Sequence, residues 1–165
     1  LDTIKIKKAV TADLETLKQI GRQTFYESFS ADNTEKDMQE YLDENFSTEK
    51  LTNELNNPYS SFYIALANNQ TIGYLKINTG DAQTELKNIQ ALEIERIYIS
   101  KEFQGKQIGK LLFDKALQLA KEIHAPYLWL GVWEKNTKAI QFYKKNGLVE
   151  FDKHMFKLGS TEKLS

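Results

Sequence analysis

Residues 92–123 read LEIERIYISKEFQGKQIGKLLFDKALQLAKEI and contain the most informative pattern in this sequence of 165 residues. The alternation of side chains at its start predicts a β-strand over Leu92–Ile99. Apolar residues then recur at helical spacing over residues 108–123, which predicts an amphipathic helix. A strand therefore leads through one short loop directly into a helix.

The loop Gln104–Gly109 places two glycines immediately before that helix. The start of a helix leaves backbone N–H groups without partners, and its dipole adds positive potential. Glycine allows a ligand to approach the backbone closely, while Lys106 and Lys110 add positive charge. The segment is therefore predicted to bind a phosphate. It matches neither GxxxxGK[ST] nor GxGxxG, so an ordinary nucleotide loop is not predicted, and a plain strand–helix turn is the alternative.

The remaining pattern predicts an α/β (α+β) fold in a single domain over residues 1–165. Further helices are predicted over Ala12–Phe29 (capped by Thr11 or Asp13), Asn33–Asn45, Thr48–Asn56 and Asn136–Asn146. Further strands are predicted over Ile4–Lys8, Ser61–Ala67, Thr71–Asn78, Tyr127–Trp133, Leu148–Phe151 and His154–Leu158. Asn68-Asn69 is typical of a tight hairpin turn. This order favours a mixed sheet covered by helices on both faces.

Composition excludes several classes of function. The chain has no cysteine and only two histidines, so we expect no disulfide, no thiolate site and no bound metal. The net charge of −1 gives no general attraction to nucleic acid. No apolar run approaches 18 residues and the first residues lack a signal-peptide core, so we expect a cytoplasmic protein without a membrane partner.

Two ordered motifs resemble those of the GNAT superfamily of N-acetyltransferases. Gln104–Gly109 is similar to that family's [QR]-x-x-G-x-[GA] loop, and the strand before it ends in Ile97-Tyr98-Ile99, similar to V-x-V. Residues 136–148, NTKAIQFYKKNGL, resemble N-x-x-A-x-x-F-Y-x-x-x-G-F. One position departs from the pattern, because Gln107 replaces the middle glycine of the loop; a side chain is tolerated there if φ stays helical.

The resemblance implies the GNAT fold, with a mixed, mostly antiparallel sheet of about six or seven strands, and acetyl-CoA as cofactor. It places the pyrophosphate on the loop amides, the pantetheine arm along the end of the strand, and Asn136 near the pantetheine or phosphates; as an alternative or in addition, Asn136 is the N-cap of its helix. The implied cofactor-binding residues are Ile97, Tyr98, Ile99, Gln104, Gly105, Lys106, Gln107, Ile108, Gly109, Lys110 and Asn136.

Acetyl transfer to an amine needs a proton acceptor, a donor for the leaving thiolate and a donor for the oxyanion. Tyr143 matches the family tyrosine that acts as general acid. Glu93 and Glu95 share one face of their strand, and different branches of the superfamily place a catalytic glutamate at each position. Either is a candidate base, with Glu95 preferred, and a backbone N–H of residue 97 or 99 is the expected oxyanion donor.

The acceptor is predicted to be a primary amine. Between residues 30 and 50, seven acids and two lysines give a charge of −5. Phe25, Tyr26 and Phe29 are the candidate substrate-binding residues, with Tyr41 and Phe46 nearby, since acids and aromatic rings suit a flexible cation. Residues 23–29 also resemble the bacterial PaiA-type branch, whose members acetylate spermidine and spermine. The alternatives are two solvated helix faces, a protein or peptide N-acetyltransferase of the ribosomal-protein type, and a non-catalytic CoA-binding regulator. The oligomeric state, a homodimer included, is left open.

Overall fold

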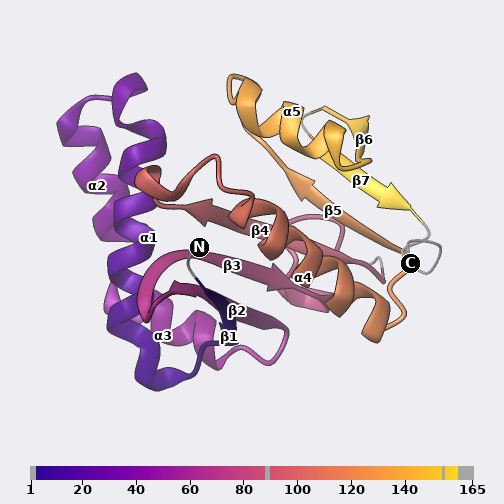
Figure 1. Cartoon of the computed structure of the whole chain (residues 1–165), viewed down its shortest axis with the longest axis horizontal. Coiled ribbons are helices and arrows are strands. Elements are labelled where there is room, and N and C mark those ends of the chain that lie inside the picture. The colour runs from indigo at the N-terminus through magenta and orange to yellow at the C-terminus, as the bar shows by residue number, and fades with distance from the viewer. Residues whose placement is uncertain (1–2, 88–89, 154, 160–165) are drawn as a thin grey trace. The chain divides into compact units, whose positions relative to one another are not determined.

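The computed structural model describes residues 3–87, 90–153 and 155–159 (Figure 1). The helices are α1 (Leu14–Phe29), α2 (Glu35–Asn45), α3 (Thr48–Asn56), α4 (Ile108–Glu122) and α5 (Thr137–Lys145). The strands are β1 (Ile4–Lys8), β2 (Ser60–Ala67), β3 (Gln70–Asn78), β4 (Leu92–Ile99), β5 (Tyr127–Gly131), β6 (Val149–Asp152) and β7 (Met155–Gly159). The predicted order of helices and strands is confirmed.

The seven strands form one sheet in the order β1-β2-β3-β4-β5-β7-β6. β4 and β5 pair in parallel, with Leu92 opposite Leu128, while β1–β2, β5–β7 and β6–β7 are antiparallel. The sheet is therefore mixed, as predicted. Asn68 and Asn69 both have positive φ values, 50° and 69°, as a two-residue turn of the predicted hairpin between β2 and β3 requires.

Two of the boundaries that differ from the prediction are informative. α1 begins at Leu14, after a short 3₁₀ turn, and no side chain caps it; the carboxylate of Asp13 instead accepts a hydrogen bond from the backbone N–H of Val10 at 2.9 Å. β5 ends at Gly131, so Trp133 lies beyond the strand and is 39% exposed. The predicted strand start at His154 lies outside the described residues.

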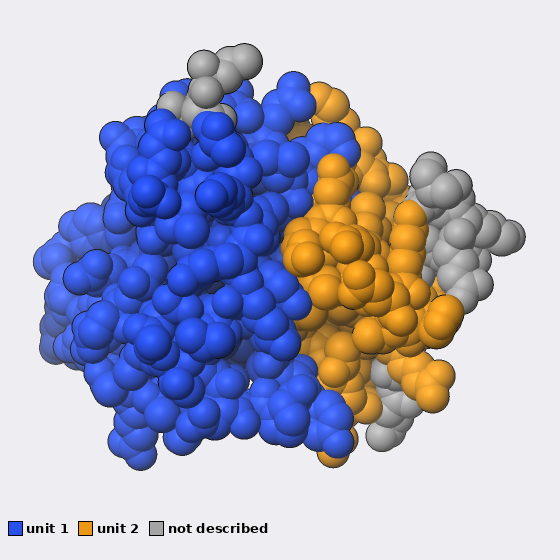
Figure 2. Space-filling model, turned by 60° about the horizontal axis from the view of Figure 1, so that its bottom comes forward, with its two compact units in different colours: residues 1–76, 96–113 blue, residues 77–95, 114–165 orange. Residues whose placement is uncertain are grey.

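The chain divides into two compact units, which Figure 2 colours blue and orange. Unit 1 contains residues 1–76 and 96–113, and unit 2 contains residues 77–95 and 114–165. β3, β4 and α4 each contribute residues to both units. The single domain over residues 1–165 stays a prediction.

Unit 1 is organised around an apolar core between its N-terminal helices and its strands, which Figure 1 shows in indigo and magenta. Its buried members are Ala9, Leu17, Ile20, Leu42, Phe46, Leu51, Phe62, Ile64 and Tyr74. Gly21 of α1 makes room for this packing, because a Cβ there would lie 2.6 Å from the ring of Phe46.

Unit 2 buries the centre of β5, where Leu128, Trp129 and Leu130 are each at most 1% exposed. The indole N–H of Trp129 donates to the side-chain oxygen of buried Gln83 at 2.7 Å, which satisfies the one polar atom of this side chain. Among the described residues of the whole chain, no helix is both long and apolar enough to cross a membrane.

Candidate functional site

The loop between β4 and α4 is exposed from Gln104 to Gln107 and is held at both ends by hydrogen bonds. The side-chain amide of Gln104 donates to the carbonyl of Ile99 at 3.1 Å, and the carbonyl of Gln107 accepts the N–H of Leu111 at 3.3 Å as α4 begins. The loop is also held from α1, because the carboxylate of Glu27 accepts the backbone N–H of Lys101 at 3.0 Å. Three hydrogen bonds therefore hold the loop that leads to the backbone N–H groups at the start of α4.

Two residues of this loop have left-handed backbone conformations. Gly105 has φ 80°, and a Cβ there would have no neighbour within 4 Å, so its backbone is open to an approaching group. Gln107 has φ 62°, so the condition that φ stays helical is not met. This conformation is the one that the family's glycine would adopt without cost, whereas a side chain makes it unfavourable. Lys106 places its ammonium 5.2 Å from the ring centre of Phe103, and Ile108 is buried, so Ile108 offers only its backbone to a ligand.

The end of β4 lies very close to β3 at Gly73. A Cβ on Gly73 would lie 2.5 Å from the carbonyl oxygen of Tyr98 and 2.7 Å from the Cδ1 atom of Ile99. The backbone N–H of Ser100 donates to the carbonyl of Ile72 at 2.8 Å. Ile97, Tyr98 and Ile99 are only half-buried, so this strand end remains partly accessible.

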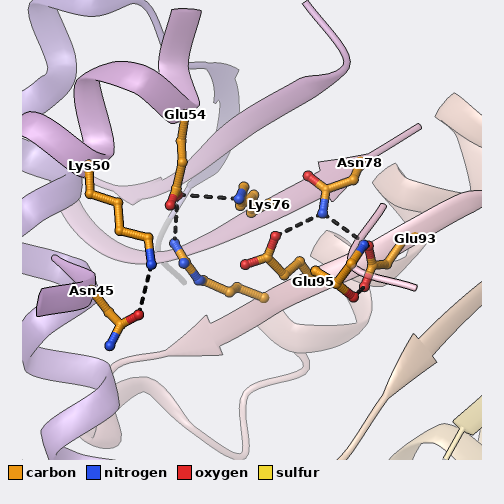
Figure 3. Close-up of polar contacts among 9 residues, drawn as sticks. Asn45, Lys50, Glu54, Lys76, Asn78, Glu93 and Glu95 are labelled. Atoms are coloured by element: carbon orange, nitrogen blue, oxygen red, sulfur yellow. Dashed lines mark hydrogen bonds and ion pairs between the residues drawn. The ribbon is translucent and has the colours of Figure 1, made fainter. Parts of the chain in front are cut away.

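Glu93 and Glu95 are brought together by a residue that the sequence did not single out. The side-chain amide nitrogen of Asn78, the last residue of β3, donates to Glu93 at 3.0 Å and to Glu95 at 2.8 Å (Figure 3). Glu93 also accepts the backbone N–H of Thr84 at 2.8 Å and its hydroxyl at 2.5 Å. In the part of the chain that the structure describes, no three His, Cys, Asp or Glu side chains gather as a metal-ligand set.

The two glutamates differ in their surroundings. Glu93 is 2% exposed, whereas Glu95 is half-buried. Burial raises the pKa of Glu93 above its ordinary value, although the hydrogen bonds from Thr84 and Asn78 oppose this effect and the charge of Glu95 adds to it. Glu93 is thus enclosed by donors, while Glu95 retains partial access to its surroundings.

α5 carries both Asn136 and Tyr143. The side chain of Asn136 accepts the N–H of Ala139 at 3.2 Å, so its predicted role as N-cap is confirmed. Tyr143 is 8% exposed and contacts Phe142 edge-on, with ring centres 5.6 Å apart. Gly147 has φ 95° just past the helix, as its C-terminal position predicts.

Two of the three candidate substrate residues of α1, Phe25 and Phe29, belong to an aromatic cluster that includes Tyr41 of α2. Phe25 stacks on Tyr41, with ring centres 4.2 Å apart and planes 7° apart, and lies 4.6 Å from Phe29 and 6.1 Å from Phe46. Tyr26 instead donates its hydroxyl to Glu35 at 2.8 Å, and this bond raises the pKa of Tyr26. The cluster therefore includes Phe25 and Phe29 but not the ring of Tyr26.

The acids of α2 are exposed, namely Glu35, Asp37, Glu40, Asp43 and Glu44. Asp43 is already paired, because Arg22 of α1 lies 3.0 Å from its carboxylate and also donates to the carbonyl of Leu42. The remaining charge on this helix keeps the surface acidic.

A charge cluster in unit 1 was also missed, in which Lys76 is buried and Glu54 and Arg96 are half-buried. The carboxylate of Glu54 on α3 lies 3.2 Å from the ammonium of Lys76 and 3.1 Å from the guanidinium of Arg96 (Figure 3). Arg96 also lies over the ring of Phe46, at 5.2 Å from its centre. A polar residue within an otherwise apolar stretch, such as Lys76 or Asn78 beside Ile77, is the sequence signal that marks such positions.

Comparisons with known proteins agree on one family. The model of the Acetyltransferase (GNAT) family matches residues 22–148. An uncharacterized N-acetyltransferase in the pepI 3′ region of Lactobacillus delbrueckii subsp. lactis is 40% identical over 94% of this chain and 90% of its own length. The spermidine N(1)-acetyltransferase of Thermoplasma acidophilum is 31% identical over 88% of each chain. The crystal structure of the PaiA N-acetyltransferase from Thermoplasma acidophilum in complex with coenzyme A superposes with a TM-score of 0.80, at 27% identity, covering 94% of this chain and 96% of that one.

Proposed function

This chain belongs to the GNAT family of acetyltransferases, and from that premise we propose that it acetylates a primary amine of a polyamine such as spermidine or spermine. The chain is an N-acetyltransferase, and acetyl-CoA is its co-substrate. The choice of polyamine rests chiefly on the 31% identity to a spermidine N(1)-acetyltransferase over 88% of the chain. A cytoplasmic location and a homodimer stay predictions.

The loop and strand end of unit 1 fit the phosphates and arm of acetyl-CoA. Residues Gln104–Gln107 are exposed, a Cβ on Gly105 would have no neighbour within 4 Å, and Lys106 and Lys110 supply positive charge. We assign the pyrophosphate to the amides of residues 104–110, and the pantetheine arm to the half-buried backbone of Ile97–Ile99. Asn136 is retained as a candidate contact, although its side-chain oxygen already caps α5.

The chemistry requires three groups of the chain. Acetyl-CoA supplies the activated acetyl thioester. Glu95 or Glu93 accepts the proton that the attacking amine loses, directly or through water. Tyr143 donates a proton to the leaving thiolate, for which a phenol is a suitable donor. A backbone N–H of residue 97 or 99 stabilises the oxyanion.

The N-terminal helices support a cationic acceptor. The aromatic cluster offers the rings of Phe25, Phe29 and Tyr41, while the acidic face of α2 attracts positive charge. Phe46 differs from these rings, because Arg96 already lies over it. A flexible amine with several positive charges matches this combination better than an amine with one charge.

A thiol-release assay tests the proposal directly. Purified protein is incubated with acetyl-CoA and a panel of spermidine, spermine, amino acids, aminoglycosides and basic peptides. We expect the highest kcat/KM with a polyamine, and a roughly 100-fold lower kcat for Tyr143→Phe with unchanged CoA affinity. Faster acetylation of a basic peptide than of any polyamine would indicate a protein substrate instead. Binding of CoA without turnover of any amine would support the alternative of a non-catalytic CoA-binding regulator.

A further inference from the structure

Asn78 occupies a position between the two candidate bases. It is fully buried at the end of β3, and its side-chain nitrogen donates to both Glu93 and Glu95 (Figure 3). A side-chain amide nitrogen has two hydrogens, so each carboxylate receives one of them. The orientation of the amide is therefore fixed by both carboxylates together.

Glu93 has the contacts of an anchor. Three donors converge on its carboxylate, one from Asn78 and two from Thr84, and only 2% of the residue is exposed. Gln83, the residue before Thr84 in the chain, accepts the buried indole N–H of Trp129 at 2.7 Å. A proton acceptor needs access to its substrate or to water, and Glu93 is the more enclosed of the two glutamates.

Glu95 has the contacts of a base held in one orientation. It is half-buried, and the Asn78 amide lies 2.8 Å from one of its oxygens. A hydrogen bond donated to a carboxylate restricts its rotamers. Such a carboxylate is preorganised to take a proton, which lowers the cost of reaching the reactive geometry.

We propose that Glu95 is the proton acceptor, and that Asn78, anchored by Glu93, is the positioning residue that orients it. This inference rests on the proposed acetyl transfer. One N–H bond of the amine breaks and one O–H bond forms on Glu95, which later releases the proton to solvent. Asn78 keeps its hydrogen bond throughout and does not exchange a proton with the substrate.

A double-mutant cycle tests the coupling between Asn78 and Glu95. kcat is measured for wild type, Asn78→Ala, Glu95→Gln and the double variant, with the amine of the panel that wild type acetylates fastest. We expect losses of about 100-fold or more for Glu95→Gln and about tenfold for Asn78→Ala. In the Glu95→Gln background Asn78→Ala should change kcat less than twofold, because a residue that acts through Glu95 has nothing left to position. Losses that multiply would overturn the proposal.

Three further variants keep the result interpretable. If Asn78→Ala does not fold, Asn78→Ser, whose hydroxyl can donate to only one carboxylate, is used in the same cycle with the same expectation. Glu93→Gln keeps an oxygen that can accept from Asn78, so it should cost less than tenfold in kcat, and a loss equal to that of Glu95→Gln would instead make Glu93 the base. Asn53→Ala, at an exposed position of α3, is the matched control. The KM for acetyl-CoA should stay within twofold in every variant.

The outcomes separate this inference from the proposed function. If the protein acetylates an amine other than a polyamine and the double-mutant cycle is non-additive, the proposed polyamine substrate is wrong and the proposed role of Asn78 stands. If the protein acetylates spermidine but the kcat losses of the two single variants multiply, the proposed polyamine substrate stands and the proposed role of Asn78 is wrong. If no amine is acetylated, both the proposed substrate and the proposed role of Asn78 are wrong.

Discussion

The carboxylate of Glu54 lies 3.2 Å from the ammonium of Lys76, a residue that is only 5% exposed. The same carboxylate holds Arg96 at 3.1 Å, so one acid from α3 neutralises cations on two strands. Glu54→Gln keeps the shape of the side chain and removes its charge. We expect a loss of about 3 kcal/mol in the free energy of unfolding, because the substitution removes the negative charge that lies beside buried Lys76 and half-buried Arg96. Urea denaturation measures this loss.

Glu49 provides the matched control for that measurement. It lies on the same helix and is exposed. Glu49→Gln should change the free energy of unfolding by less than about 0.5 kcal/mol. Equal effects of the two substitutions would show that the Glu54 cluster contributes no more than a surface charge.

Gln107 adopts a left-handed conformation that disfavours side chains, with φ 62°. Gln107→Gly should remove a conformational cost of about 1 kcal/mol, of which the greater freedom of glycine in the unfolded chain cancels about half. We therefore expect a stabilisation of about 0.5 kcal/mol, seen as a higher urea midpoint with an unchanged m-value.

Substitution of Gln104 by glycine should have the opposite effect on the free energy of unfolding. Gln104 has φ −70°, which any residue adopts, and its amide donates to the carbonyl of Ile99. Gln104→Gly should therefore destabilise the protein by about 1 kcal/mol, since it loses a hydrogen bond and adds chain entropy. A stabilisation by both variants would mean that the φ of Gln107 is not the source of the effect.

The order of elements could be predicted because the signals for it are local. The Asn68-Asn69 turn, the cap at Asn136 and the glycine after α5 each depend on neighbouring residues. The end of β5 could not be predicted in this way, because the apolar pattern continues to Trp133 while pairing with β7 stops where Gly131 meets Met155. The apolar pattern is a property of one segment, whereas the length of a strand also depends on its partner.

The candidate site shows the same division. The loop and its two glycines could be found from the sequence, since both lie in one segment. The links between Asn78 and Glu95, 17 residues apart, and between Glu54 and Arg96, 42 residues apart, depend on strand register and on the packing of α3. Periodicity places Glu93 and Glu95 on one face of the strand but does not reveal that Asn78 donates to both of them. It therefore left the choice of base open.

Gly73 is required by the close approach of β3 and β4. A Cβ at this position would lie 2.5 Å from the carbonyl oxygen of Tyr98, a backbone atom that cannot move without moving the strand. Gly73→Ala should cost about 1–3 kcal/mol of stability through overpacking. Because the displaced strand end is the proposed pantetheine site, the KM for acetyl-CoA should rise as well.

Gly159 serves as the control for that substitution. A Cβ on Gly159 would have no neighbour within 4 Å. Gly159→Ala should therefore change stability by less than about 0.5 kcal/mol and leave the KM for acetyl-CoA unchanged. A normal KM in a destabilised Gly73→Ala variant would argue against pantetheine binding along Tyr98 and Ile99.

The environment of Glu93 makes stability depend on pH. Burial raises the pKa of Glu93 above the ordinary value of 4.5, so between the unfolded and folded pKa values the folded protein binds this proton more tightly than the unfolded chain. The contribution of Glu93 to stability therefore falls as the pH rises through that window, with a limiting slope of about 1.4 kcal/mol per pH unit. Glu93→Gln does not titrate. Wild type should thus lose stability relative to Glu93→Gln as the pH rises from about 4.5, which urea denaturation at a series of pH values measures. A relative gain by wild type would show that the hydrogen bonds from Thr84 and Asn78 outweigh burial, because donors to a carboxylate stabilise its charged form.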